Sequence, residues 1–164
     1  MKDTFFEIEK QLEMLENMYN YSTSEYRIEP LLKMFHQNEL FISEYRTNFI
    51  WNNYKKSRFI ESLLLGMPAL PMFICNREDG LFELIDGAQR LLAIDQFVNE
   101  NLKLTELEKL TFLNGLGFMD LSFFRRQKFM LINIRFQVSI HNISSETKKD
   151  IFDRLNTNKT RPNL

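Results

Sequence analysis

The polar residues best suited to chemistry lie together in the segment Asp86-Gly87-Ala88-Gln89-Arg90. It follows a short apolar run, residues 81–85, that is typical of a strand, and it precedes a segment with apolar positions at helical spacing. The first N–H groups of a helix have no intrahelical acceptor and lie at the positive end of the helix dipole, so anions bind at such places. This turn is therefore a candidate phosphate site.

Each side chain of the turn has a chemical role that it could take. Gly87 permits close backbone approach, and Arg90 offers a planar fork for phosphate oxygens. Asp86 would repel a phosphate unless it held a divalent cation or activated a water. We therefore name Asp86, Gln89 and Arg90 as the catalytic candidates, Gly87 and Arg90 as nucleotide ligands, and Asp86 as the ligand of a Mg²⁺ bound with a nucleoside triphosphate.

A purely structural interpretation of the same residues stays open. Asp86 and Gln89 have the spacing of a capping box, in which Asp86 accepts from the helix start and Gln89 reaches back. Arg90 would then pair with Asp86, four residues earlier. The sequence contains neither a P-loop nor a Gly-x-Gly-x-x-Gly motif that would favour phosphate binding independently.

Hydrophobic periodicity and turn residues predict the elements that must position this turn. Gly66 and Pro68 mark a helix end, and residues 76–80 are typical of a hairpin loop. Predicted helices cover residues 4–19, 28–37, 54–66, a stretch from 88 onward, 122–130 and a last helix opening at Ser144 or Ser145. Extended segments are predicted within 40–51 and over 70–75, 81–85 and 132–140.

Composition narrows the class of protein. The chain has 164 residues, of which 44% are hydrophobic and 26% charged, with only five Gly and four Pro. This is typical of one globular domain, residues 1–164, without a linker. The apolar runs are too short for a membrane span, no export signal is evident, and a single cysteine, Cys75, favours a cytoplasmic setting and a place in the core.

Charge is distributed unevenly along the chain. The net charge is −1, but residues 1–44 carry four Lys/Arg against nine Asp/Glu, and residues 121–164 carry nine against three. This uneven charge could present a cationic surface to nucleic acid, could favour head-to-tail self-association, or could belong to side chains that are simply solvated. The candidates for a nucleic-acid surface are Arg125, Arg126, Lys128, Lys148 and Lys149. Phe123, Phe124 and Phe129 lie among them and are predicted to be core, and the first helix is predicted to pack on its own domain.

Three blocks of sequence, residues 59–68, 85–91 and 151–157, together carry a family resemblance. The chain resembles the ParB/sulfiredoxin-like domain at the N-terminus of GmrSD-type restriction proteins and related phage-defence proteins, whose signature is Asp-Gly-Gln-Gln-Arg. The resemblance covers about residues 25–164 and leaves residues 1–22 as an extra N-terminal helix.

The resemblance implies an α+β fold, a compact domain with a small mixed sheet packed with several helices and a nucleotide pocket at the Asp-Gly-x-Gln-Arg turn. It implies nucleoside triphosphate hydrolysis that licenses DNA cleavage, often by a separate nuclease, with DNA as a further partner. Asp86, Gly87, Gln89 and Arg90 match the signature, whereas Ala88 replaces the usual glutamine. Glu61 and Asn156, inside the other two blocks, are second-line nucleotide ligands.

The segment before the third predicted helix differs from a further motif of the family. Tyr45 and Trp51 match it, but Arg46 stands in the family's glutamine position and Thr47 in its arginine position. Tyr45 and Arg46 are retained as nucleotide-binding candidates. Because Ala88 and Thr47 remove polar groups, the alternative is a non-catalytic DNA- or protein-binding regulator that keeps the fold without turnover. No nuclease motif is present, so nuclease activity of this chain alone is not expected.

Overall fold

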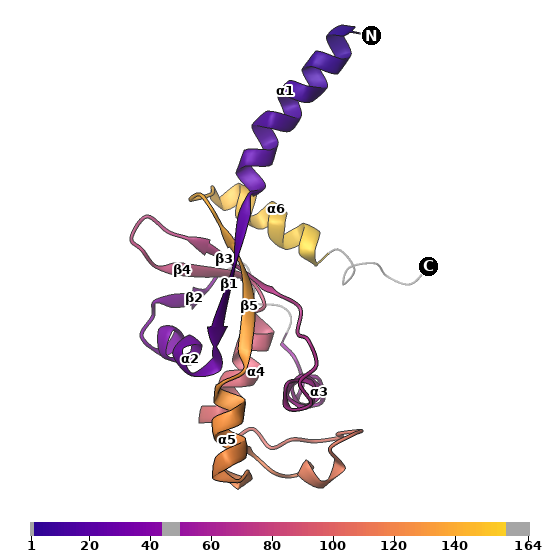
Figure 1. Cartoon of the computed structure of the whole chain (residues 1–164), viewed down its shortest axis with the longest axis vertical. Coiled ribbons are helices and arrows are strands. Elements are labelled where there is room, and N and C mark those ends of the chain that lie inside the picture. Colours follow the sequence, from indigo (N-terminus) through magenta and orange to yellow (C-terminus); the bar gives the residue numbers. More distant parts are fainter. Residues whose placement is uncertain (1, 44–49, 157–164) are drawn as a thin grey trace.

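The computed structural model describes residues 2–43 and 50–156 (Figure 1). Its elements follow in the order α1 (Lys2–Tyr19), β1 (Tyr21–Arg27), α2 (Ile28–His36), β2 (Leu40–Ile42), α3 (Asn53–Leu64), β3 (Met72–Asn76), β4 (Phe82–Asp86), α4 (Ala88–Asn99), the 3-10 turns η2 (Thr111–Leu113) and η3 (Phe118–Asp120), α5 (Phe123–Met130), β5 (Asn133–Ser139) and α6 (Ser145–Leu155). The predicted helices and the predicted hairpin are confirmed.

The strands form one mixed sheet in the order β1-β5-β3-β4-β2. β3 and β4 are the antiparallel hairpin, while β5 runs parallel to β3 and β2 parallel to β4. The predicted α+β class with a small mixed sheet is therefore confirmed. Sequence analysis missed β1, which pairs antiparallel with β5 from Tyr21 opposite Ser139 to Arg27 opposite Asn133. Its sequence, YSTSEYR, lacks the apolar alternation that identifies a strand.

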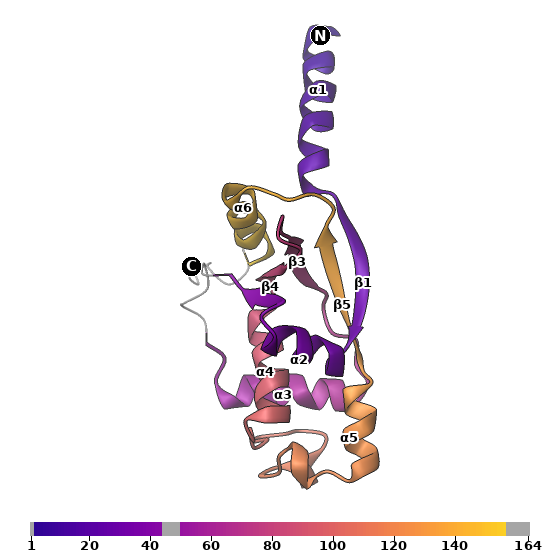
Figure 2. The same ribbon diagram turned by 90° about the vertical axis from the view of Figure 1, so that its left-hand side faces the viewer.

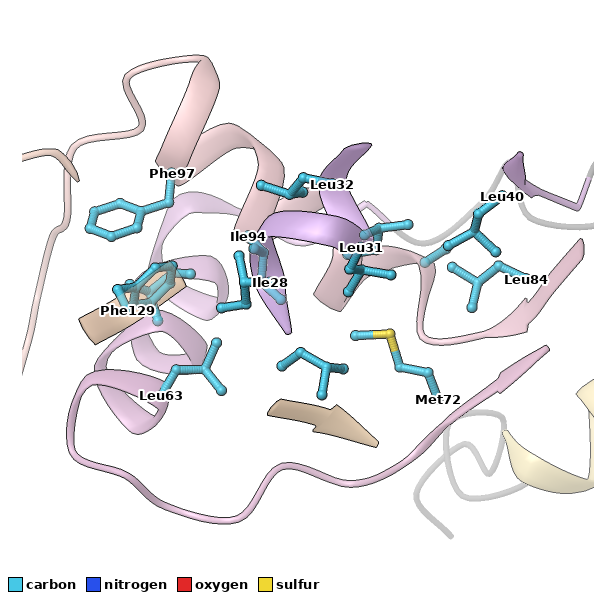
Figure 3. Close-up of a cluster of buried hydrophobic side chains, with 14 of the residues drawn as sticks. Ile28, Leu31, Leu32, Leu40, Leu63, Met72, Leu84, Ile94, Phe97 and Phe129 are labelled. Atoms are coloured by element: carbon cyan, nitrogen blue, oxygen red, sulfur yellow. The ribbon is translucent and has the colours of Figure 1, made fainter. Parts of the chain in front are cut away.

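The two faces of the sheet bury different cores because successive side chains of a strand point to opposite sides. Met72 and Ile74 of β3 and Leu84 of β4 join the main core, which α2, α3, α4 and α5 also line (Figure 3). The residues that alternate with them belong to a second, smaller core beneath α6. That core contains Phe73, Cys75, Ile85, Ile143 and Ile151.

Cys75 is fully buried in the second core, as predicted for a core residue. Burial raises the pKa of the Cys75 thiol to about 11, although a hydrogen bond with Ser139 and the charge of Lys148 act in the opposite direction. The folded protein therefore favours the neutral thiol.

We expect this thiol to make the protein less stable at high pH. The folded pKa lies above the unfolded value of 9.0, so the thiol's contribution is complete below pH 9 and is lost as the pH rises toward 11. By about pH 10.5 the loss amounts to about 2 kcal/mol. Urea unfolding at pH 8 and pH 10.5 should show this fall in wild type and a smaller one in Cys75→Ala; equal falls in the two proteins would contradict it.

The N-terminal helix does not pack on its own domain, so that prediction is wrong. α1 extends beyond the sheet, and each of residues 4–19 is exposed, although the Tyr19 hydroxyl at its C-terminal end donates to Asp150 of α6 at 2.8 Å (Figures 1 and 2). The reason lies in the chain path, since a single residue, Asn20, separates α1 from the edge strand β1. The helix therefore leaves from the end of the strand. Within the described ranges, no helix combines the length and the apolar character that a bilayer crossing requires.

Candidate functional site

The predicted turn lies between β4 and α4. Asp86 is the last residue of β4, and Gly87 is the N-cap of α4 with a φ of +109°. A side chain at Gly87 would also collide with its neighbour, because an ideal Cβ there lies 2.5 Å from Cγ of Met72. Glycine is thus required both by the backbone conformation and by the close approach of β3.

Arg90 holds the turn to the loop that precedes β3. Its Nη2 donates to Oδ2 of Asp86 at 2.6 Å, and its Nη1 donates to the carbonyl oxygens of Leu70 and Pro71, the latter at 3.2 Å. Only 13% of the Arg90 side chain and 18% of the Asp86 side chain are exposed. Burial lowers the pKa of the Arg90 guanidinium, and the Asp86 carboxylate opposes that shift. Asp86 and Arg90 therefore form a neutralised pair within the chain.

Gln89 points to a segment far away in sequence. Its Oε1 accepts a hydrogen bond from the backbone N–H of Trp51 at 2.9 Å. The predicted Asp86–Arg90 pair is thus confirmed, but the predicted capping box is wrong. Gly87, not Asp86, is the N-cap of α4, and the Gln89 oxygen accepts from Trp51 instead of reaching back to the helix start. Since the oxygen is used by Trp51, the NH₂ of Gln89 is the group that could donate to an anion.

Asn156 brings the third sequence block to the turn. It is the C-cap of α6, and its Nδ2 donates to Phe152 O at 2.8 Å and to Asp86 Oδ1 at 3.4 Å. Asp86 and Asn156 are 70 residues apart in the chain. The structure therefore places residues of two of the three motif blocks side by side, as the nucleotide-site prediction requires.

Glu61 makes its contacts elsewhere. Its carboxylate is buried, and Oε1 accepts from the backbone N–H groups of Lys109 and Leu110, each at 2.8 Å. Burial tends to raise the pKa of Glu61, but these backbone donors and the nearby Arg58 outweigh it and hold the pKa below its usual value. Glu61 thus anchors the loop after α4 and does not face the turn, in contrast to its predicted role as a nucleotide ligand.

Two further candidates, Tyr45 and Arg46, lie outside the described residues, as does Thr47. Trp51, which belongs to the same motif, is described. Its ring is half-buried and packs edge-on against Phe59 with the ring centroids 5.8 Å apart. The contact of its backbone N–H with Gln89 places Trp51 beside the turn.

The carboxylates around the turn are a poor fit for a metal held by the protein. Among the described residues, no group of three or more His, Cys, Asp or Glu side chains could hold a metal ion. Asp86 already contacts Arg90 and Asn156. Mg²⁺ prefers six oxygen ligands and is commonly bound through one or two carboxylates plus substrate phosphates. The predicted Mg²⁺ would therefore have to be held mainly by the nucleotide.

The predicted nucleic-acid residues do not form one surface. Arg125, Arg126 and Lys128 lie on α5, whereas Lys149 lies on α6, at another part of the molecule (Figure 1). Lys148 is buried, and its Nζ lies 2.7 Å from Oε2 of Glu83. Lys148 therefore belongs to the interior and cannot contribute to a cationic surface, in contrast to the prediction.

Several groups that shape the site could not be predicted from the sequence. These are the carbonyl oxygens of Leu70 and Pro71, the N–H of Trp51 and the side chain of Met72. Three of them are backbone groups, which carry no residue-specific signal. A groove of about 230 Å³ lies elsewhere, between the end of α1 and the segment 141–147, and includes none of the turn residues.

Comparison with known proteins supports the sequence resemblance. A family model described as "GmrSD restriction endonuclease, N-terminal domain" matches residues 28–163. A search of the curated proteins found no significant match. Among solved structures, the C-terminally truncated chromosome-partitioning protein ParB from Caulobacter crescentus, complexed with CTP-gamma-S, is similar with a TM-score of 0.46 and 12% identity. The alignment covers 87% of this chain and 56% of that one, so the chain spans little more than half of ParB.

Proposed function

Because this chain belongs to the family of GmrSD restriction endonuclease N-terminal domains, we propose that it binds a nucleoside triphosphate at the turn 86–90 in a DNA-restriction or phage-defence system. The observation that carries the proposal is the meeting of Asp86 and Asn156 at the N-terminus of α4. Residues from two separate motif blocks converge there on a helix start whose N–H groups suit a phosphate.

The contacts of the turn assign different roles to its residues. Arg90 neutralises Asp86 and ties the turn to Leu70 and Pro71, so Asp86 no longer repels an approaching phosphate. The backbone N–H groups that open α4 and the NH₂ of Gln89 are then the phosphate donors. In this arrangement Arg90 acts first as a positioning residue for the turn. Mg²⁺ would be brought by the nucleotide, and DNA and a separate nuclease are the proposed partners.

A second candidate function is the non-catalytic regulator. The observation that favours it is the engagement of Arg90, whose guanidinium is used by two carbonyl oxygens and a carboxylate of its own chain. A guanidinium held in this way is less available to stabilise charge that develops during hydrolysis. Binding and turnover must therefore be measured separately.

The proposal predicts that at least one of ATP, GTP, CTP and UTP binds the full-length chain in isothermal titration calorimetry with Mg²⁺. Gln89→Ala removes a phosphate donor and should weaken binding about tenfold, or about 1.4 kcal/mol. Gln37→Ala, an exposed glutamine on another loop, is the matched control and should leave the affinity unchanged.

If none of the four nucleotides bound at about 1 mM, the proposal would be rejected. This concentration detects binding with a free energy as weak as about −4 kcal/mol. Equal affinity of wild type and Gln89→Ala would reject the assigned donor. Phosphate release should be followed in the same samples. Release supports an enzyme, whereas binding without release identifies the non-catalytic regulator.

A further inference from the structure

The exposed helix α1 carries an apolar stripe whose last residue, Tyr19, also donates from its hydroxyl to Oδ2 of Asp150 in α6 at 2.8 Å. Phe5, Ile8, Leu12, Leu15 and Tyr19 follow one another at steps of three and four residues, so they share one face of the helix. The exposed fraction of these five side chains ranges from 38% to 66%. A continuous apolar stripe of this kind marks an interaction surface.

The same helix is strongly acidic beside this stripe. Residues 4–19 contain four glutamates and one lysine, a balance of −3. Glu9 directly follows Ile8 and Glu16 directly follows Leu15, so both carboxylates flank the stripe on the same side. A partner surface must therefore offer apolar groups with cations beside them.

α5 presents that combination. Phe123 and Phe124 are 70% and 69% exposed, in contrast to the sequence prediction that both are core, and only Phe129 is buried. Residues 122–130 contain Arg125, Arg126 and Lys128 and no acidic residue, a balance of +3. Phe124 and Lys128 are four residues apart and share the exposed face of the helix. We call Phe123, Phe124, Arg125 and Lys128 the α5 surface.

The segment that precedes α5 enlarges this apolar area. Phe112 in η2 is 97% exposed and Met119 in η3 is 68% exposed. Phe112 and Met119 lie in the segment between α4 and α5, at the same end of the molecule as the α5 surface (Figure 1). Exposed phenylalanine and methionine are typical of the centre of protein interfaces.

α1 cannot reach the α5 surface of its own chain, because the two helices lie at opposite ends of the molecule in both views (Figures 1 and 2). We propose that α1 of one copy docks on the α5 surface of a second copy of this chain. The apolar stripe would contact Phe123 and Phe124, and the glutamates of α1 would face Arg125 and Lys128. This inference is independent of the proposed nucleotide site.

The contacts favour a second copy over nucleic acid as the occupant of the α5 surface. Of the residues predicted to form a cationic surface, Lys148 is buried and Lys149 lies on another helix. The cations that remain on α5 lie beside two large exposed apolar side chains, Phe123 and Phe124, which match the stripe of α1. Because the two contacting surfaces differ, the contact is heterologous, and it builds rings or chains of copies unless it closes reciprocally.

Charge reversal tests this inference in the full chain by sedimentation velocity. We expect the average mass of wild type to rise as the protein concentration is raised from about 10 to 500 µM, because a small transient interface has a dissociation constant in this range. The acidic-helix variant, Glu9→Lys with Glu16→Lys, and the α5 variant, Arg125→Glu with Lys128→Glu, should each raise the apparent dissociation constant about tenfold or more. The matched control, Lys33→Glu with Arg77→Glu, reverses two cations elsewhere and should associate like wild type.

The decisive sample is an equal mixture of the two variants. Each supplies a surface that complements the other, so association should return to the wild-type level, as it should in the chain that carries all four substitutions. A wild type that stays monomeric up to about 500 µM overturns the inference.

Two other outcomes would also overturn it. Association that survives in the α5 variant but not in the acidic-helix variant would indicate pairing of α1 with α1. Loss of binding to a duplex DNA probe in the α5 variant, with the mass of both variants unchanged from wild type, would assign the α5 surface to nucleic acid instead.

Discussion

Replacement of Lys148 by alanine is expected to lower the free energy of unfolding by about 3–5 kcal/mol, because it leaves a buried carboxylate without its partner. The Lys148 and Glu83 side chains are 11% and 10% exposed, and their charged atoms lie 2.7 Å apart between α6 and β4. Urea unfolding monitored by circular dichroism measures the change. Lys149→Ala, at the adjacent exposed position of the same helix, is the matched control and should change the stability by less than about 0.5 kcal/mol.

A compensating substitution separates the loss of the partner from the loss of packing. Lys148→Met combined with Glu83→Leu replaces the ion pair by apolar side chains of similar size, and such replacements are often neutral or stabilising. We expect this double variant to recover most of the stability that Lys148→Ala loses. If Lys148→Ala and Lys149→Ala were equally stable, Lys148 would not be the buried partner of Glu83.

Gly87→Ala is expected to destabilise the protein by about 2–6 kcal/mol through two separate effects. The φ of +109° is a conformation that a side chain disfavours, which costs about 1–3 kcal/mol. The added Cβ would lie 2.5 Å from Cγ of Met72, and such overpacking costs about 1–3 kcal/mol more. Thermal and urea unfolding measure the sum.

Gly80→Ala separates the two effects. Gly80 in the hairpin loop also has a positive φ, +78°, but a Cβ there would meet no atom within 4 Å. Its substitution should therefore show the backbone cost without the collision, and it should be clearly milder than Gly87→Ala. A similar loss in both variants would mean that Met72 yields to the added methyl group and that the close approach of β3 to the turn is not fixed.

The candidate site was largely predictable as a list of residues but not as a set of contacts. Asp86, Gly87, Gln89 and Arg90 are recognisable because a strand, a glycine and a helix follow one another within a short stretch of chain. Apart from the Asp86 carboxylate, the partners of Arg90 and Gln89 described above are backbone groups 19 to 38 residues away. Backbone groups are the same at every residue, so no pattern of side chains could predict which of them lie near the turn.

Local sequence patterns determined the helices, the hairpin between β3 and β4 and the glycine at the start of α4, because these features depend on neighbours a few residues apart. The tertiary structure alone decided the pairing of the polar strand β1, the projection of α1, the burial of Lys148 and the meeting of Asn156 with Asp86. Each of these depends on which surface faces a distant segment. An amphipathic or charged helix has the same sequence pattern whether that surface meets its own domain, another copy or solvent.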